Sequence, residues 1–163
     1  MLPWNQRPME ANLANPALCA LLLRQTVIGY REKALRGLEF PLAFTVLPIV
    51  LHDGIRAMLP YSTATKLHVW VQKHHHVRIG FVEHVQNLVP ITKEAIIFGL
   101  QHGALQFDGE GMLVAGQREL ADFDVTPKSN VADCVKRAYF IGRWFADAGA
   151  PASVLNAFEV NIS

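Results

Sequence analysis

The chain lacks the features that mark secreted, membrane-spanning and disulfide-stapled proteins. Its two cysteines, Cys19 and Cys134, both fall in apolar segments, where a free thiol behaves as a small hydrophobic group. The longest apolar run, 41–51, is too short to cross a bilayer. The opening residues, MLPWNQRPME, have neither the basic start nor the apolar core of a signal peptide. We therefore expect a soluble cytoplasmic protein in a reducing compartment, without membrane contact.

A strong charge of either sign is also missing. The 15 Lys and Arg residues nearly balance the 14 Asp and Glu residues, which leaves a formal net charge of +1. No basic field is available to hold nucleic acid without sequence preference, so we expect DNA to reach this chain only through a complex. Apolar residues make up 51% of the chain and charged residues 18%, which argues against disorder. This composition predicts a single domain, 1–163, with part of its apolar surface covered by a partner.

Residue patterns of known enzyme classes are absent as well. No glycine-rich loop is followed by Lys and Ser or Thr, the arrangement that cradles the phosphates of a nucleotide. The candidate nucleophiles Ser62, Thr63 and Cys134 have no glycine elbow and no recognisable base pattern around them. We predict no catalytic and no cofactor-binding residues.

The histidines are the remaining candidates for chemistry. His74, His75 and His76 are adjacent, and His68 and His84 are near them in sequence. Adjacent residues do not share a helix face, and zinc ligands converge at recurring spacings with cysteine or carboxylate company that is missing here. A polar turn between helices explains these residues better than a metal site, and an enzyme with a histidine-based site is the weakest hypothesis.

Turning to what is present, Asn15 and Pro16 predict the start of a helix of about five turns, because asparagine caps helices and proline suits the first helical position. Gly37 is the predicted end. The apolar face contains Leu18, Leu21, Leu22 and Ile28, and the basic residues available to solvent are Arg24, Arg31 and Lys33.

The apolar stretch 41–59 predicts a buried helix interrupted at Pro48. The competing interpretation is a buried strand that ends near Pro48. The helix is preferred because apolar positions continue past the proline into a polar patch of His52, Asp53 and Arg56.

Residues 65–116 have the outline of a winged helix-turn-helix. Thr65 is a candidate cap for a short helix, a second helix covers 77–88, and a third starts at Thr92 after Pro90 and ends before Gly103. The segments ALQFD and MLVAG, joined by a glycine-rich turn, predict a hairpin. The fold class is therefore mainly α with a small β-hairpin, in a single helical domain that contains a winged helix-turn-helix-like unit.

The remainder divides into a polar segment and a helix. Residues 117–130 are rich in turn formers and predict an exposed connector. Asn130 and Asp133 resemble a capping box, and apolar spacing predicts a helix from there to about 148. The segment 149–151 breaks this helix, and the apolar tail after it is expected to dock.

The helix TKEAIIFGLQH would be the recognition helix of the winged unit. Only Lys93, Gln101 and His102 are suited to bases or phosphates, and Glu94 repels DNA. The apolar residues Ile96, Ile97, Phe98 and Leu100 require burial. This helix therefore favours protein docking over reading a DNA groove.

Tryptophan and arginine mark a second candidate interface. In GRWFA, Gly142 permits close approach of another backbone, and Arg143 with Trp144 is a pairing enriched in interface hot spots. The alternative is a core tryptophan beside a solvated arginine. Trp4 is likewise either a lid on the core or an anchor for a partner.

Several blocks together carry a family resemblance. They are EANLANPALCALLL, PLAFTVLPIVLH, the pair Leu59 and Pro60, ITKEAIIFGLQHGAL and AYFIGRWFADAG. Over residues 8–160 the chain resembles the middle-component family of bacterial three-component ABC ATPase systems. Such systems, including the Lamassu type of anti-phage and anti-plasmid defence, couple an SMC-like or ABC ATPase to an effector that is often a nuclease. The resemblance implies an adaptor that braces the ATPase and keeps the effector inactive until foreign DNA is sensed.

Two functions from different classes follow. The first is a non-enzymatic adaptor between the ATPase subunit and the effector subunit, with partner contacts expected at Trp4, His52, Arg56, Lys93, Arg143 and Trp144. The alternative is a winged-helix DNA-binding regulator, with phosphate contacts expected at Lys66, Lys73, Arg78 and Lys93.

Overall fold

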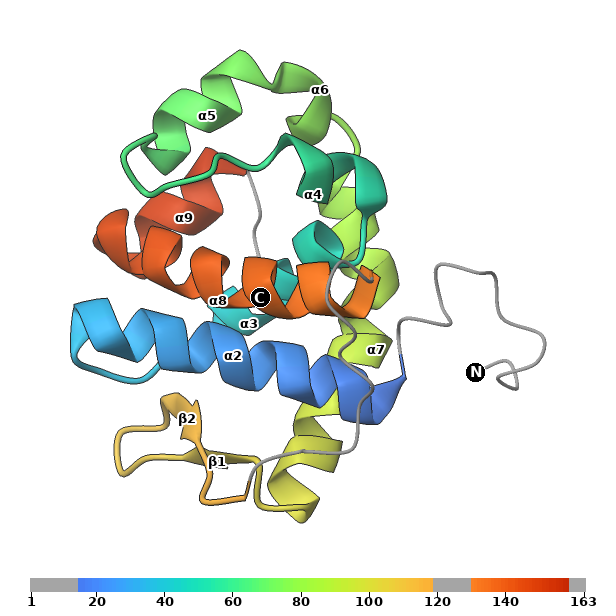
Figure 1. Ribbon diagram of the computed structural model, residues 1–163, viewed down its shortest axis with the longest axis vertical. Coiled ribbons are helices and arrows are strands. Elements are labelled where there is room, and N and C mark those ends of the chain that lie inside the picture. Colours follow the sequence, from blue (N-terminus) through green and yellow to red (C-terminus); the bar gives the residue numbers. More distant parts are fainter. Residues whose placement is uncertain (1–14, 119–129, 159–163) are drawn as a thin grey trace.

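A computed structural model describes residues 15–118 and 130–158 (Figure 1). In chain order the elements are α2 (Pro16–Ala34), α3 (Phe40–Val50), α4 (Asp53–Met58), α5 (Leu67–Lys73), α6 (His75–Arg78), α7 (Phe81–Gln101), β1 (Leu105–Phe107), β2 (Leu113–Ala115), α8 (Asn130–Asp147) and α9 (Pro151–Ala157). The described part of the chain is thus mainly helical with one two-stranded antiparallel hairpin, which confirms the predicted fold class at that level.

Helix α2 begins where the sequence predicts. The side-chain oxygen of Asn15 accepts a hydrogen bond from the Ala17 N–H at 2.8 Å, and Pro16 is the first helical residue. The helix ends at Ala34 with Leu35 in a left-handed conformation, before the predicted stop at Gly37. Gly37 instead lies against the hairpin, where a Cβ atom would come within 2.7 Å of the Met112 side chain.

The closest contact between helices is the crossing of α2 and α8, which run side by side across the molecule (Figure 1). A Cβ atom added at Gly142 would clash with the Thr26 carbonyl, and one at Gly29 would clash with the Tyr139 carbonyl. The Thr26 hydroxyl donates a hydrogen bond to the Ala138 carbonyl across the crossing at 2.9 Å. Gly142 therefore does admit a second backbone, and that backbone belongs to α2 of the same chain.

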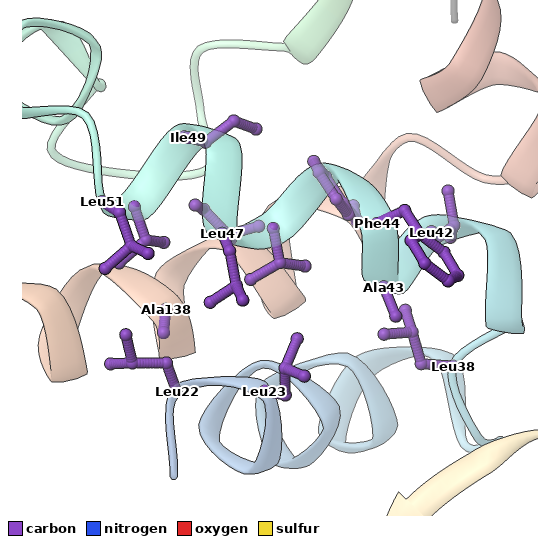
Figure 2. Packing of buried hydrophobic residues seen from close by; sticks show 14 of the residues in the cluster. Leu22, Leu23, Leu38, Leu42, Ala43, Phe44, Leu47, Ile49, Leu51 and Ala138 are labelled. Atoms are coloured by element: carbon purple, nitrogen blue, oxygen red, sulfur yellow. The ribbon is translucent and has the colours of Figure 1, made fainter. Parts of the chain in front are cut away.

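Helix α3 is the centre of the core, which confirms the helical interpretation of 41–59 over the strand. Its residues from Leu42 to Val50 are all buried, and in Figure 2 Leu47 points toward Leu22 and Leu23 of α2 while Ile49 points to the opposite side. The predicted interruption at Pro48 was wrong. Pro48 lies inside α3, and the helix ends only after Val50. His52 has an extended backbone, and its Nδ1 accepts a hydrogen bond from the Ile55 N–H, which starts α4 as a separate helix.

Helix α7 spans the segment where the sequence predicted two helices separated by a turn. The two helices expected on either side of Pro90 are one continuous helix, and Thr92 is a buried residue within it. Pro90 lies inside the helix and is exposed, so its ring does not have to fit into the packed core. Thr65 is also not the cap of α5, since Lys66 holds that position. With no turn before the expected recognition helix, a winged helix-turn-helix is not confirmed.

The predicted hairpin is present, and its attachment to the helices was not foreseen. Asp108 closes the turn by accepting hydrogen bonds from the Glu110 and Met112 N–H groups. Arg24 of α2, expected in solvent, is buried and donates hydrogen bonds to the carbonyls of Ala104 and Gly116 at 3.0 and 2.7 Å. One guanidinium therefore holds both ends of the hairpin against α2, beside which the hairpin lies in Figure 1.

Helix α8 covers the predicted span, and Gly149 in a left-handed conformation separates it from α9. Helix α9 packs against α3 and α5. Val154 in α9 and Phe158 just after it are fully buried, and the ring of Phe158 stacks on that of Phe81 in α7. Most of the predicted connector 117–130 and the end of the predicted docking tail lie outside the described residues.

Candidate functional site

The three adjacent histidines fall at the junction of α5 and α6 and have different surroundings. His74 stacks on Trp70 with 4.5 Å between ring centroids, and its Nδ1 lies 2.7 Å from the Trp70 carbonyl. His75 and His76 are exposed. Within residues 15–118 and 130–158, no three His, Cys, Asp or Glu side chains are grouped so that they could hold a metal ion.

Three histidines from different elements do meet at a pocket of about 260 Å³ between α4, α6 and the start of α7. The pocket is lined by His52, Gly54, Ile55, Met58, His76, Val77, Ile79, Gly80, Phe81 and His84. We call it the histidine pocket. Of these three histidines, only His52 was predicted as a contact residue. The sequence did not reveal the group, because its members come from separate elements that only folding brings together.

The geometry of the histidine pocket sets the role of His52. Its Nδ1 accepts the hydrogen bond from Ile55, so in the neutral imidazole the proton is on Nε2. Its ring meets the ring of His84 edge to face, with 5.4 Å between centroids. On the other wall, Nε2 of His76 lies 3.2 Å from the sulfur of Met58. The pocket therefore combines imidazole groups with apolar walls.

A second hollow, of about 410 Å³, lies between the start of α2 and the second half of α7. It is lined by Pro16, Pro90, Lys93, Glu94, Ile97, Phe98 and Gln101. We call it the α7 groove. Ile97 is 54% exposed and Leu100 37% exposed, although the sequence led us to expect burial of both. Ile96 is buried as expected, because it lies on the face of α7 that contacts the core.

Arg56, a predicted contact residue, is a structural clamp. It is 5% exposed and donates hydrogen bonds to the Val50 carbonyl, to Asp53 and to Asp133, which joins α3, α4 and α8. Burial lowers the pKa of the guanidinium, but its hydrogen bonds with the two carboxylates outweigh that effect and the pKa is raised. Arg56 thus remains charged and presents almost no surface to a partner.

Trp144 and Arg143, which the sequence predicted as either an interface pair or a core tryptophan beside a solvated arginine, have different environments. Trp144 is fully buried, donates its indole N–H to the Thr65 carbonyl at 2.7 Å and meets Trp70 edge to face. This is the environment of a core tryptophan. Arg143 is partly exposed and forms an ion pair with Glu32 at 3.1 Å. The remaining tryptophan of the predicted interface, Trp4, lies outside the described residues.

Comparison with known proteins adds the family. The model of the family described as ABC-three component (ABC-3C) system Middle Component 3 matches residues 4–162. The chain belongs to this family. Neither the curated proteins nor the solved structures contain a match. The family name places this Middle Component 3 chain in a multi-component ABC system, so other components of that system are plausible partners.

The basic residues predicted to contact DNA do not form one row on this Middle Component 3 chain. Lys66 is paired with Asp147 at 2.6 Å. Lys73 and Arg78 lie on α5 and α6, whereas Lys93 lines the α7 groove. Lys93 is twelve residues beyond the first residue of α7, which corresponds to about 18 Å along a helix.

Two further features of the Middle Component 3 chain bear on its chemistry. Neither Cys19 nor Cys134 is in a disulfide and both are buried. Burial raises the pKa of the Cys19 thiol to about 12 and also raises the pKa of Cys134. Such thiols do not act as nucleophiles near neutral pH. In the part of the chain that is described, every helix is too short or too polar to cross a membrane.

Proposed function

We propose that this chain is a non-enzymatic adaptor subunit that links an SMC-like or ABC ATPase to an effector, a nuclease, in bacterial anti-phage or anti-plasmid defence of the Lamassu type. The observation that carries the proposal is the family match over residues 4–162. The two thiols are buried with raised pKa values, so neither is suited to act as a nucleophile near neutral pH.

The α7 groove is the surface that we assign to the ATPase. Ile97 and Leu100 are large apolar side chains exposed on one helix, and the groove beside them is bordered by Lys93, Glu94 and Gln101. An apolar centre with a polar rim is the usual composition of a stable protein interface. A helix or loop of the ATPase that fills this groove would cover the apolar surface predicted from composition.

Co-expression with the other two components tests this assignment. A tagged wild-type chain is expected to retain the ATPase through purification, and Ile97→Glu is expected to lower the retained amount about tenfold or more, because a charge would be buried at the interface centre. Leu35→Glu is the matched control, since Leu35 is 84% exposed at the other end of α2. Equal retention of the ATPase by the wild type, Ile97→Glu and Leu35→Glu would contradict the groove assignment.

A DNA-binding regulator is the alternative, and it has less support. It requires Lys66, Lys73, Arg78 and Lys93 to contact phosphates, yet Lys66 is paired with Asp147 and Lys93 lies on a different part of the surface. Each phosphate neutralised adds roughly one unit to the slope of log affinity against log salt. DNA binding by the isolated chain with a steep salt slope would favour the regulator, and no binding would remove it.

A further inference from the structure

The histidine pocket has a chemical character that the adaptor assignment does not use. Three imidazoles line it, and none of the described residues in its lining is acidic. Asp53, the carboxylate next in sequence to His52, points to Arg56 and is paired with it at 2.8 Å. The other walls are the apolar side chains of Ile55, Met58, Val77, Ile79 and Phe81. An acceptor or an anion entering this pocket meets donors and no competing negative charge.

Two of the imidazoles are placed to donate. The capping bond of His52 occupies Nδ1, which places the N–H of the neutral ring on Nε2, and His52 lines the pocket. The Nε2 of His76 lies 3.2 Å from the Met58 sulfur, and a thioether is a weak acceptor. A carboxylate would be a stronger partner for either group, because hydrogen bonds to an ionised acceptor are roughly twice as strong as neutral ones.

The mouth of the pocket supplies an apolar contact. Among the large hydrophobic residues that line the pocket, Ile79 is the most exposed, at 80%. The left-handed turn at Gly80, with φ of 80°, ends the short α6 and starts α7 immediately after it. Ile79 is therefore held on this turn beside the imidazoles, where a partner can cover it.

We propose that the histidine pocket binds a segment of the effector that inserts one carboxylate side chain between the imidazoles and packs a neighbouring apolar side chain on Ile79. This inference rests on the proposed adaptor function. The volume of about 260 Å³ suits side chains of a peptide and is small for a folded element.

The effector is chosen over the ATPase for a physical reason. An apolar groove suits a permanent contact, whereas a small pocket that depends on charge gives a contact that forms and breaks more readily. An effector that must be released needs a contact that forms and breaks readily. The two sites also leave room for two partners, because Phe81 in the pocket and Ile97 in the groove are separated by sixteen residues of one helix, or about 24 Å.

A charge series at His76 tests the pocket in the co-expressed three-component complex. His76→Glu is expected to lower the effector retained by the tagged chain about tenfold, because like charges repel in the pocket, while the retained ATPase stays unchanged. His76→Lys is expected to retain the effector. His75→Glu is the matched control, since His75 is exposed on the same short helix and does not line the pocket. Melting temperatures close to that of the wild type confirm that the variants fold.

The outcomes are distinguishable. Unchanged effector retention in His76→Glu would overturn the pocket, and so would loss of the ATPase in place of the effector. If Ile79→Glu lowers retention but His76→Glu and His76→Lys behave alike, the contact is apolar and the carboxylate is wrong. If the wild-type chain retains neither component, the adaptor function itself fails.

Discussion

At the scale of single residues, Arg24 shows how one buried cation positions a whole hairpin. It donates to the carbonyls of Ala104, which precedes β1, and Gly116, which follows β2. A shorter side chain at this position would remove the guanidinium from both carbonyls and open a space beneath the hairpin, although the Ala104 carbonyl would keep its hydrogen bond from the Gly116 N–H.

We expect Arg24→Ala to lower the free energy of unfolding by about 3 kcal/mol, because hydrogen bonds from a charged donor to buried acceptors are lost. Urea unfolding followed by circular dichroism measures this change. Arg31→Ala on the exposed side of the same helix is the control, expected within about 0.5 kcal/mol of the wild type. Equal effects of the two substitutions would mean that Arg24 does not hold the hairpin.

Asp147 predicts a pH dependence. Hydrogen bonds from Lys66, which has the larger effect, and from Lys33 lower its pKa below the usual value. A carboxylate whose pKa is lower in the folded state stabilises the fold above its unfolded pKa, and that contribution is lost as the pH falls through the folded pKa. The window is therefore below about pH 4.

We expect Asp147→Asn to lower stability near pH 6 by less than about 1 kcal/mol, because solvent screens this ion pair, and to match the wild type at the acid end. Melting temperatures from pH 2.5 to pH 6.5 test this. Glu110→Gln in the exposed turn is the control. A constant difference between Asp147→Asn and the wild type across that range would exclude the ion pair as its cause.

At the scale of elements, the crossing of α2 and α8 depends on two glycines. The backbones approach so closely that a methyl group at Gly142 meets the Thr26 carbonyl, which belongs to a hydrogen-bonded helix and has little room to move. The threonine hydroxyl bonded to the Ala138 carbonyl adds a polar contact at the same place. The pair of helices is therefore specified by small side chains as well as by apolar burial.

We expect Gly142→Ala to destabilise the protein by about 3 kcal/mol, despite the better helix propensity of alanine, because overpacking forces the two helices apart. Gly109→Ala is the control, since a Cβ atom there meets nothing within 4 Å. Thermal unfolding of both variants decides the point. A stabilised Gly142→Ala protein would show that the helices can separate at little cost.

At the scale of the whole molecule, α7 connects the two candidate binding sites. Its first turn contributes Phe81 and His84 to the histidine pocket, and its second half contributes Lys93, Ile97 and Phe98 to the α7 groove. Substitutions that far apart without shared partners act independently in most proteins.

We therefore expect the double variant Ile97→Glu with His76→Glu to lose both other components. Its binding free energy for the ATPase should equal that of Ile97→Glu, and its binding free energy for the effector that of His76→Glu, each within about 0.5 kcal/mol. Quantified co-purification of each component with the two single variants and the double variant measures this. Loss of the effector from Ile97→Glu alone would indicate that the two sites serve one partner.

The elements that the sequence predicted well are those set by local chemistry. The start of α2 follows from Asn15 and Pro16, and the hairpin follows from Asp108 and its glycines, because caps and turns depend on residues a few positions apart. The break at Pro90 was wrong for the opposite reason. Packing of the face of α7 that includes Phe81, Val85 and Ile96 holds the helix together across a residue that locally disfavours it.

The candidate site was harder to predict than the fold. Of the predicted contact residues, His52 and Lys93 line hollows, Arg56 and Trp144 are buried, and Arg143 is paired with Glu32. Composition indicated excess apolar surface, but Ile97 was expected to be buried with Ile96. Two neighbours on a helix lie about 100° apart, and the position of the core decides which of them it covers.

By itself, the sequence determined the helical class, the start of α2, the hairpin, the span of α8 and the family, because these depend on periodicity, capping residues and the order of apolar blocks along the chain. Only the tertiary structure decided that Arg24 is buried, that Trp144 is core and that His52, His76 and His84 share one pocket. The physical reason is that periodicity defines the faces of a helix, whereas the neighbour that covers each face is set by packing between residues far apart in the chain.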